Sequence, residues 1–497
     1  MIRLLAFRSL LDRPLRTAFL LFGYACGVGV MITLLSIGEA LMLQARDERL
    51  VGGGEVTVLP EGVDIEVLKT GGLGGLFFSI DHARFVYRQL LAAPRMREHV
   101  AAAAPQVEGK LLYLRSPDGA EHPVRAGGEI PSLQRAVGAA VPLAAGAWED
   151  DDGDRRWRDP TPVELRHEID RFHLPPPAAR GDSSWAEWHY FNVVSADSRR
   201  WAFISFIVGG EVPDGRWGAQ VLVTLHEQGS ARSRRFTAVV PPERVQLSTT
   251  TADLALGESS VRVLPNGDYA VRARAREDGS GAQLALDLVV RPAARQYFPS
   301  ASLGGDAVVS GYAVPALRAD ADGSLCVAGR CERYERAQAY HDHNWGVWRG
   351  VTWEWGASRA GDFTVLYGRV EPPDSIATQQ PLFVYVVDSL GFVALFRPRN
   401  VAYEDGRVTR VDGAGIAVPS RGVMLDVRGA DTLRLELLIE DAVATDTRAP
   451  GAERGDVNAR RLARPYFIQM KGRARLSGRV NGRPLMGEGL GFFETYR

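Results

Sequence analysis

The chain has 497 residues, which is long enough for two to four domains. Apolar residues make up 45% and charged residues 24%, as in ordinary globular proteins, and the formal charge of −1 argues against a nucleic-acid partner. The sequence contains no Gly-x-x-x-x-Gly-Lys-Ser/Thr and no Gly-x-Ser-x-Gly motif, which excludes a P-loop nucleotidase and argues against an α/β-hydrolase. We therefore expect no nucleic acid and no cofactor.

An uncharged run near the N-terminus covers residues 17–38. As a helix it would cross a hydrocarbon core of about 30 Å. Arg3, Arg8, Arg13 and Arg16 precede the run, so the positive-inside rule keeps the N-terminus in the cytoplasm. We expect an uncleaved single-pass anchor in a bacterial inner membrane, with the C-terminal domains in the periplasm or outside the cell. A cleaved signal peptide is the alternative.

The next part of the chain has mixed helix and strand signals. Residues 80–94 have the apolar spacing of a helix, and residues 111–114 lead as a strand into the turn Ser-Pro-Asp-Gly at 116–119. A second helix is predicted over 164–172, and three prolines at 175–177 stiffen a short linker. This pattern predicts a small α+β domain.

From residue 183 onward, short runs rich in Val, Leu, Phe, Tyr and Trp alternate with turn signals, and helical periodicity is scarce. The predicted turns are Asn-Gly or Asp-Gly pairs that begin at 266, 278, 322, 405, 412 and 481. Regular short strands with polar turns indicate an all-β sandwich or barrel. The stretch is too long for one eight-stranded barrel, so two in tandem are expected.

Residues 340–346 read Tyr-His-Asp-His-Asn-Trp-Gly, the densest set of chemically capable side chains in the chain. In an extended strand, side chains alternate between faces, which puts Tyr340, Asp342 and Asn344 on one face and His341, His343 and Trp345 on the other. In a barrel, one of these faces looks into the cavity. A carboxyl group in an apolar cavity resists ionising and can donate a proton near neutral pH.

This motif resembles the signature of the carotenoid 1,2-hydratase (hydroxyneurosporene synthase) and AttH-like family. Residues 187–190 resemble the family's Glu-Trp-Trp-Tyr strand, with His189 in place of the second Trp, and residues 478–482 and 487–494 support the resemblance. It covers roughly the last two thirds of the chain. The resemblance implies two lipocalin-like barrels, with Tyr340 and Asp342 as the functional positions. The motif occurs in hydratases, cyclase-like enzymes and members without known activity, so it marks the fold more firmly than the reaction.

The N-terminal segment resembles the start of a macrolide-exporter or lipoprotein-releasing type of ABC permease, on residues 8–17, 52–54 and 56–62. Such permeases have four membrane helices, and a large periplasmic domain follows the first. This chain has no second run of about 18 apolar residues, so it cannot line a pathway by itself. The resemblance implies an ABC transporter permease and ATPase as partners.

The expected fold is mainly β, with two tandem lipocalin-like (calycin) barrels behind one transmembrane helix and a small α+β periplasmic domain. The expected boundaries are 1–45 for the anchor, 46–145 for the reduced permease-type domain, 146–182 for the linker, 183–310 for the first barrel and 311–497 for the second.

Asp342 is the candidate catalytic acid, and Tyr340 would orient it or relay its proton. Tryptophans could stabilise a carbocation by cation–π attraction. The ligand-binding candidates are Trp188, His189, His341, His343, Asn344, Trp345, Trp348, Trp353 and Trp355. The alternative for Asp342 is a structural carboxyl that fastens the barrel through hydrogen bonds. Glu187 and Glu494 are expected to be buried acids or, by default, partners of arginine.

His341 and His343 form a His-x-His pair, but the spacing supplies no third ligand, so we predict no metal site and expect the rings to contact backbone carbonyls. Cys326 and Cys331 flank a four-residue segment, and an oxidising location would permit a disulfide between them.

Two functions follow from these features. The first is a membrane-anchored, cofactor-independent hydratase or cyclase, resembling a hydro-lyase, that protonates a double bond of an isoprenoid or lipid-like ligand. The second is a non-catalytic carrier or accessory protein that hands an apolar small molecule to an ABC transporter.

Overall fold

The computed structural model describes residues 13–45, 56, 58, 83, 86–87, 95–96, 99–117, 119, 121–137, 151–152, 162–173, 175 and 185–497, the last range with gaps at 212–215, 229, 231–232, 304–309, 349–350, 372–380, 412–413 and 447–463. The chain divides into two compact units. One combines Met1–Ser79 with His99–Arg156, and the other combines Ile80–Glu98 with Trp157–Arg497.

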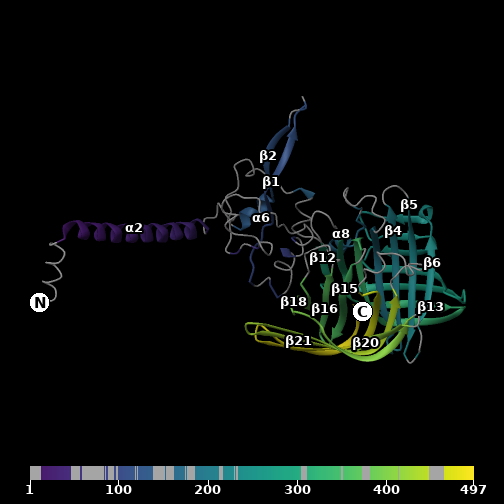
Figure 1. The fold of residues 1–497 in the computed structure, drawn as a ribbon. Coiled ribbons are helices and arrows are strands. Elements are labelled where there is room, and N and C mark those ends of the chain that lie inside the picture. Colours follow the sequence, from purple (N-terminus) through teal and green to yellow (C-terminus); the bar gives the residue numbers. More distant parts are fainter. Residues whose placement is uncertain are drawn as a thin grey trace, which may run out of the picture. The chain divides into compact units, whose positions relative to one another are not determined.

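The first unit contains the helix α2 (Pro14–Ala45), the hairpin of β1 (Gln106–Arg115) and β2 (Glu121–Glu129), and the short helix α6 (Pro131–Ala136) (Figure 1). Proline suits the first position of α2, where its missing N–H would have no helical partner. The stretch Pro14–Glu39 has a mean hydropathy of 2.1, and it is long and apolar enough to cross a membrane. A signal sequence near the N-terminus has the same properties.

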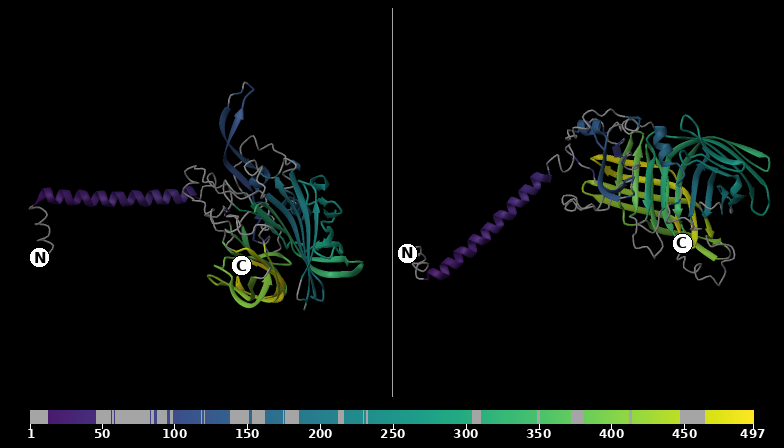
Figure 2. Two further views of the ribbon diagram at one scale, coloured as in Figure 1. Left: turned by 45° about the vertical axis from the view of Figure 1, so that its right-hand side comes forward. Right: turned by 90° about the horizontal axis from the view of Figure 1, so that it is seen from above.

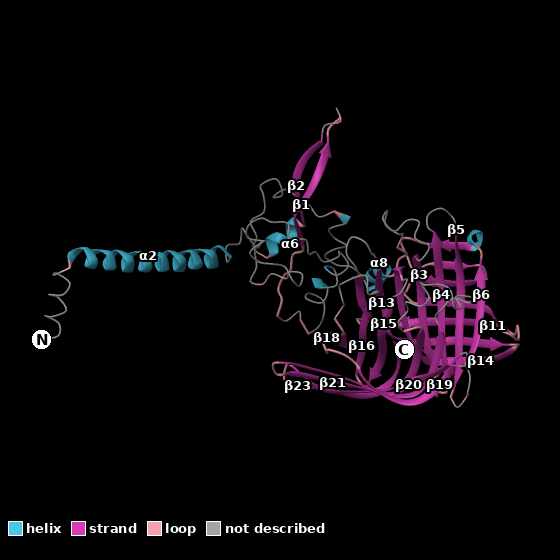
Figure 3. Ribbon diagram, viewed as in Figure 1, coloured by secondary structure: helices cyan, strands magenta, loops and turns pink. Residues whose placement is uncertain are grey.

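The larger segment of the second unit, Trp157–Arg497, begins with the helix α8 and continues almost wholly as strands (Figure 3). The elements of its first half are α8 (Pro162–Ile169), β3 (Trp185–Val194), β4 (Arg200–Glu211), β5 (Arg216–Glu227), β6 (Arg234–Val240), η3 (Pro242–Arg244), β7 (Val245–Leu247), β8 (Leu254–Leu256), β9 (Ser259–Val263), β10 (Tyr269–Glu277), β11 (Gln283–Pro292), β12 (Phe298–Leu303), β13 (Ser310–Val327) and β14 (Arg330–Val347).

Eight of these strands close into an antiparallel barrel in the order β11-β13-β14-β3-β4-β5-β6-β10, and β10 pairs again with β11. The strands β7–β9 continue from β10, and β12 pairs with β13. Alternate side chains of the ring form one apolar cluster that includes the fully buried Phe191, Ile204, Val221 and Leu286. An eight-stranded barrel is narrow enough for side chains to fill, and this cluster occupies the interior.

Nine strands form the second sheet: β15 (Thr352–Ala360), β16 (Phe363–Glu371), β17 (Phe383–Asp388), β18 (Gly391–Phe396), β19 (Ala402–Val411), β20 (Ala414–Arg428), β21 (Asp431–Asp446), β22 (Tyr466–Val480) and β23 (Arg483–Tyr496). Their order is β18-β17-β16-β15-β23-β22-β21-β20-β19. The sheet curls on itself (Figure 2), and its own apolar cluster includes Val384, Met424 and Met470. No pairing joins the outer strands β18 and β19 in the described part of the chain.

The prediction of a mainly β chain with two large antiparallel sheets behind one apolar helix is confirmed. The expected boundary at 310/311 differs from the observed sheets, because β13 and β14 complete the first barrel and the second sheet starts at Thr352. Of the helix expected over 80–94, only residues 83, 86 and 87 are described, and they are helical.

The turns predicted at Asn266, Asp278 and Asn481 are confirmed, while the one at 412 lies outside the described residues. The turns predicted at Asp322 and Asp405 are wrong, because both pairs lie inside strands at irregular register. Gly323 has a φ of 152°, and a Cβ there would lie 2.0 Å from the Asp287 carbonyl oxygen. Glycine inside a strand here marks a β-bulge.

The hairpin of β13 and β14 turns at Ala328 and Gly329, and a disulfide joins Cys326 to Cys331 across it.

Candidate functional site between the two sheets

The strand β14 divides its side chains between two environments. It pairs with β3 so that Asp342 lies opposite Tyr190 and Asn344 opposite Trp188. These four side chains line a cavity between the barrel and the second sheet. His341 and His343 lie on the other face, next to Phe172 and Phe191 of the barrel cluster. The predicted alternation along residues 340–346 is therefore present.

The cavity has a volume of about 320 Å³. The first sheet contributes side chains from β3–β6, β13 and β14, and the second from β15, β16 and β21–β23. Its aromatic lining consists of Trp188, Tyr190, Phe203, Tyr312, Trp348, Trp353, Trp355 and Phe467. The cavity that was expected inside a barrel lies instead between the barrel and the second sheet, because core side chains fill the barrel interior.

Asp342 is held by two neighbours on its own strand. Its Oδ2 accepts a hydrogen bond of 2.9 Å from the Tyr340 hydroxyl, and its Oδ1 accepts one of 2.7 Å from Asn344 Nδ2. The Tyr340 oxygen in turn accepts a hydrogen bond of 2.9 Å from Trp355 Nε1. These hydrogen bonds fix the carboxyl group of Asp342 at the cavity wall. Asp342 is only 4% exposed, so its carboxyl group is also shielded from bulk solvent.

A second carboxyl group, Glu494 of β23, lines the same cavity and is 6% exposed. It accepts hydrogen bonds from Trp353 Nε1 at 2.9 Å and from Gln469 Nε2 at 3.3 Å. Within the described residues it makes no ion pair, so the arginine partner expected by default is absent there. Glu187 also differs from that expectation, because its carboxylate lies against His173 and His343.

Burial, and then the nearby Glu494 carboxyl, raise the pKa of Asp342 to about 7. Burial likewise raises the pKa of Glu494. Desolvation disfavours the charged form of both groups, and two carboxylates without a cation repel each other. The carboxyl group of Asp342 therefore retains its proton to a higher pH than an exposed aspartic acid does, next to apolar walls.

The tryptophans of the cavity pack edge to face. Trp188 lies 4.9 Å from Trp348, and Trp348 lies 6.1 Å from Trp353, between ring centroids. Trp355 lies over Gly368, where a Cβ would come within 2.4 Å of the indole. Glycine at that position makes room for the ring, which then donates to Tyr340.

The predicted site residues separate into two groups. Asp342 and five ligand-binding candidates line the cavity: Trp188, Asn344, Trp348, Trp353 and Trp355. Tyr340 does not line it, but its hydroxyl donates to Asp342. The other four candidates do not line it, because His189, His341 and His343 face the barrel interior and Trp345 packs beside Trp185 and stacks on His173.

Two further residues of the cavity lining, Tyr190 and Gln469, were not predicted from the sequence as site residues, and Glu494 was not predicted to line the cavity. Tyr190 could have been found from the alternation of residues 187–190, had the pairing of β3 with β14 been known.

The barrel-facing histidines surround Asp170, which directly follows α8. His341 Nε2 lies 3.1 Å and His343 Nδ1 2.9 Å from its carboxylate oxygens. Tyr269 donates a hydrogen bond of 2.7 Å to the same carboxylate. The contact between His341 and a backbone carbonyl is present, at 3.0 Å from Tyr190 O. Asp170, His189 and His341 could hold a metal ion.

No protein-family model matches the chain, and no curated protein matches it. Of the solved structures that resemble the chain, we compare three that each align with 66% of it. They are an AttH-type protein (NE1406) from Nitrosomonas europaea (14% identity, 98% of that chain, TM-score 0.43), CghA with Sch210972 (14%, 97%, 0.43) and kievitone hydratase from Nectria haematococca (13%, 94%, 0.38). These values are too low to assign a family, so function must follow from the chain's own residues.

Proposed function

We propose that the cavity between the two sheets binds an apolar, isoprenoid or lipid-like ligand and that Asp342 protonates a double bond of that ligand. One observation carries the proposal: a buried carboxyl group with a raised pKa, fixed by Tyr340 and Asn344, faces a cavity of about 320 Å³ whose walls include eight aromatic side chains. Ligand pockets of this kind combine an apolar lining with a few convergent polar groups.

The reaction would begin with transfer of the Asp342 proton to the less substituted carbon of a trisubstituted alkene, whose π electrons form the new C–H bond. The other carbon becomes a tertiary cation. The faces of Trp188, Trp353 and Trp355 provide electron density for it.

Two outcomes regenerate the acid. In hydration, a water oxygen bonds to the cation and one of its protons returns to the Asp342 carboxylate. In cyclisation, the π electrons of an internal alkene form the new C–C bond and leave the positive charge on the other alkene carbon. A carbon next to that cation then loses a proton, which returns to the Asp342 carboxylate. Glu494 lies on the same cavity and is placed to orient the water or accept this proton first.

The test uses geranylgeraniol, a neutral isoprenoid, in D2O with the purified full-length chain. Wild type should incorporate deuterium and form a hydrated or cyclic product, detected by mass spectrometry. Asp342→Asn should bind the probe without converting it. Conversion at the wild-type rate by Asp342→Asn would overturn the role of this acid.

A non-catalytic carrier is the second candidate, and the apolar helix α2 favours it because that helix could hold the protein at a membrane. In the same assay, probe binding without conversion by wild type would support the carrier. The residues that resemble an ABC permease lie largely outside the described part of the chain, so permease and ATPase partners stay an expectation from sequence.

We also propose that the second unit lies outside the cytoplasm. The arginines before residue 17 and the disulfide between Cys326 and Cys331 support this location. Labelling of a cysteine placed at the exposed Asp278, from outside intact cells, would test it; labelling only after lysis would contradict it.

A further inference from the structure

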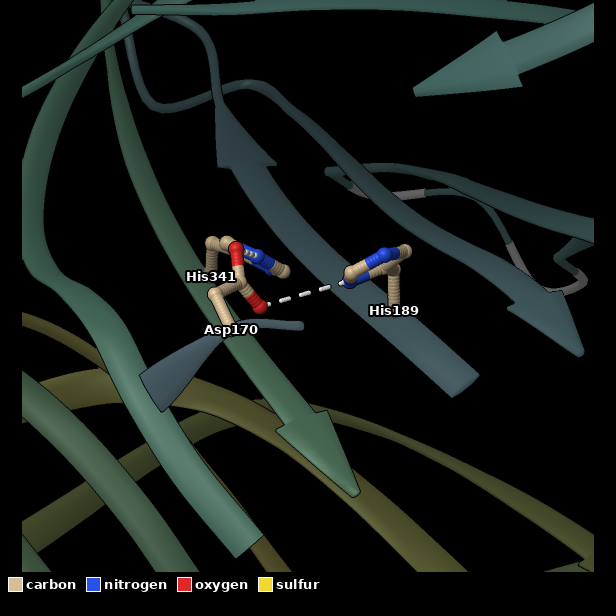
Figure 4. Close-up of side chains that lie close together, drawn as sticks. All are labelled: Asp170, His189 and His341. Carbon is tan, nitrogen blue, oxygen red and sulfur yellow. Dashed lines mark hydrogen bonds and ion pairs between the residues drawn. The ribbon is translucent and has the colours of Figure 1, made fainter. Parts of the chain in front are cut away.

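We propose that Asp170, His189 and His341 bind a divalent transition-metal ion inside the first barrel. The three side chains come from distant parts of the chain: the end of α8, β3 and β14. All three residues are fully buried. One ligand atom of each lies within 4.8 Å of the others (Figure 4), and the imidazoles flank the carboxylate.

The second nitrogen of each imidazole is already committed to a backbone carbonyl. His189 Nε2 lies 3.0 Å from Ala252 O, and His341 Nδ1 lies 3.0 Å from Tyr190 O. A carbonyl oxygen only accepts hydrogen bonds, so these two nitrogens carry protons. In the neutral rings, the nitrogens that face Asp170 are then unprotonated, and an unprotonated imidazole nitrogen can donate its lone pair to a metal ion.

Protonating the two nitrogens that face Asp170 would not give both of them a hydrogen-bond acceptor. A proton on His341 Nε2 could bridge the 3.1 Å to Asp170 Oδ2. His189 Nδ1, however, lies 3.6 Å from Asp170 Oδ1, which is too long for a hydrogen bond, and it has no hydrogen-bond partner among the described residues. A fully buried nitrogen without a partner is costly, and a cation between it and the carboxylate would remove that cost.

The spacing agrees with a shared ion. Two ligand atoms that each lie about 2 Å from a tetrahedral ion are about 3.3 Å apart. His341 Nε2 lies 3.1 Å from Asp170 Oδ2 and His189 Nδ1 lies 3.6 Å from Oδ1, so each nitrogen is near this distance from one oxygen of the carboxylate. Imidazole and carboxylate ligands without a thiolate suit Zn²⁺ and its first-row neighbours.

The surrounding groups hold the carboxylate in place. Tyr269 donates to Asp170 Oδ2 at 2.7 Å, and His343 Nδ1 lies 2.9 Å from Oδ1. Beyond His343, Glu187 adds a second buried carboxylate, 2.9 Å from His343 Nε2. Such outer contacts orient metal ligands in proteins. Glu187 itself already accepts the backbone N–H of His173 at 2.7 Å, which makes it a supporting group here.

The ion would fasten the residue after α8 to β3 and β14 from the barrel side. It lies on the opposite face of β14 from Asp342, so the inference does not depend on the proposed function.

The first experiment measures the metal content of the full-length chain, expressed with added Zn²⁺, by mass spectrometry of the elements. Wild type should carry about one ion per chain. In both His189→Ala and His341→Ala the metal content per chain should fall by about tenfold or more. His226→Ala is the matched control, because His226 is also buried but contacts Ser233 and Asp441 instead. It should keep the ion.

The second experiment uses wild type alone, so that it does not depend on the folding of the variants. After unfolding and chelation, refolding with Co²⁺ should give the visible absorption of a bound tetrahedral ion and a higher Tm than refolding without metal. Refolded wild type that takes up no Co²⁺ or Zn²⁺, or equal metal loss in His226→Ala and His189→Ala, would overturn the proposal.

Discussion

Both faces of β14 carry buried ionisable side chains, but the surroundings of the two faces differ. On the barrel face, His341 and His343 are fully buried around Asp170 among packed core residues. On the other face, Tyr340 and Asp342 are almost as buried, but Asp342 borders a cavity of about 320 Å³. The period-2 alternation of a strand therefore puts a set of tightly packed ionisable groups directly behind a set that can meet a ligand.

This difference predicts opposite responses to substitution. Groups on the barrel face should affect mainly the free energy of unfolding, because their partners are left buried and unpaired. Substitution of side chains that line the cavity, such as Asp342 and Ser205, should affect mainly binding and turnover, because the cavity leaves them space and alternative partners. The following changes test this contrast, from the largest expected loss of stability to the smallest.

Asp170→Asn should lower the free energy of unfolding by about 3–5 kcal/mol, because it removes the carboxylate from a buried group of histidines. Urea unfolding followed by circular dichroism measures this loss. Asp278→Asn is the control, since Asp278 is exposed and should change stability by less than about 0.5 kcal/mol. A loss below about 1 kcal/mol for Asp170→Asn would remove the distinction between the faces.

Two adjacent residues of β4 extend the contrast to a second strand. Ile204 is fully buried in the barrel cluster, so Ile204→Ala should cost about 2–5 kcal/mol through the cavity it leaves. Ser205 borders the existing cavity, and Ser205→Ala should change stability by less than about 0.5 kcal/mol. The same unfolding measurement compares them, and equal losses would contradict the assignment of the two faces.

A pair of tyrosines separates stability from function. Each hydroxyl donates to a buried carboxyl group, Tyr269 to Asp170 and Tyr340 to Asp342. Removing either hydroxyl as Tyr→Phe should cost about 1–3 kcal/mol. Only Tyr340→Phe should slow conversion of geranylgeraniol, because only Tyr340 holds the proposed acid. A similar slowing in Tyr269→Phe would show that the assay follows stability instead.

Asp342→Asn should change the free energy of unfolding by less than about 1 kcal/mol. The amide keeps an acceptor for the Tyr340 hydroxyl and removes a carboxyl group that burial already disfavours in its charged form. Turnover should nevertheless be lost. A large destabilisation by Asp342→Asn would favour the structural alternative for this residue.

Local patterns predicted much of the fold. The turns at Asn266, Asp278 and Asn481 and the two faces of residues 340–346 followed from short-range rules. The register of the two sheets did not, because bulges at Gly323 and Gly406 have the same Asp-Gly signature as a turn. The boundary at 310 failed for a related reason, since only long-range pairing shows that β13 and β14 return to β11 and β3.

The site required contacts that no local pattern contains. Asp170 reaches His341 across 171 positions, and Trp353 reaches Glu494 across 141. Alternation assigned Asp342 and His341 to opposite faces, but it could not show which face meets the cavity. For the same reason, the spacing of the His-x-His pair could not show that Asp170 and His189 lie beside His341.

Energy transfer from tryptophan to retinol tests the central claim most directly, because several indoles line the cavity and the retinol polyene absorbs where tryptophan emits. Wild type should show saturable transfer, and Ser205→Phe, which fills the cavity from β4, should abolish it while the exposed control Val239→Phe does not. Undiminished transfer in a folded Ser205→Phe variant would show that the ligand binds elsewhere and would contradict the account.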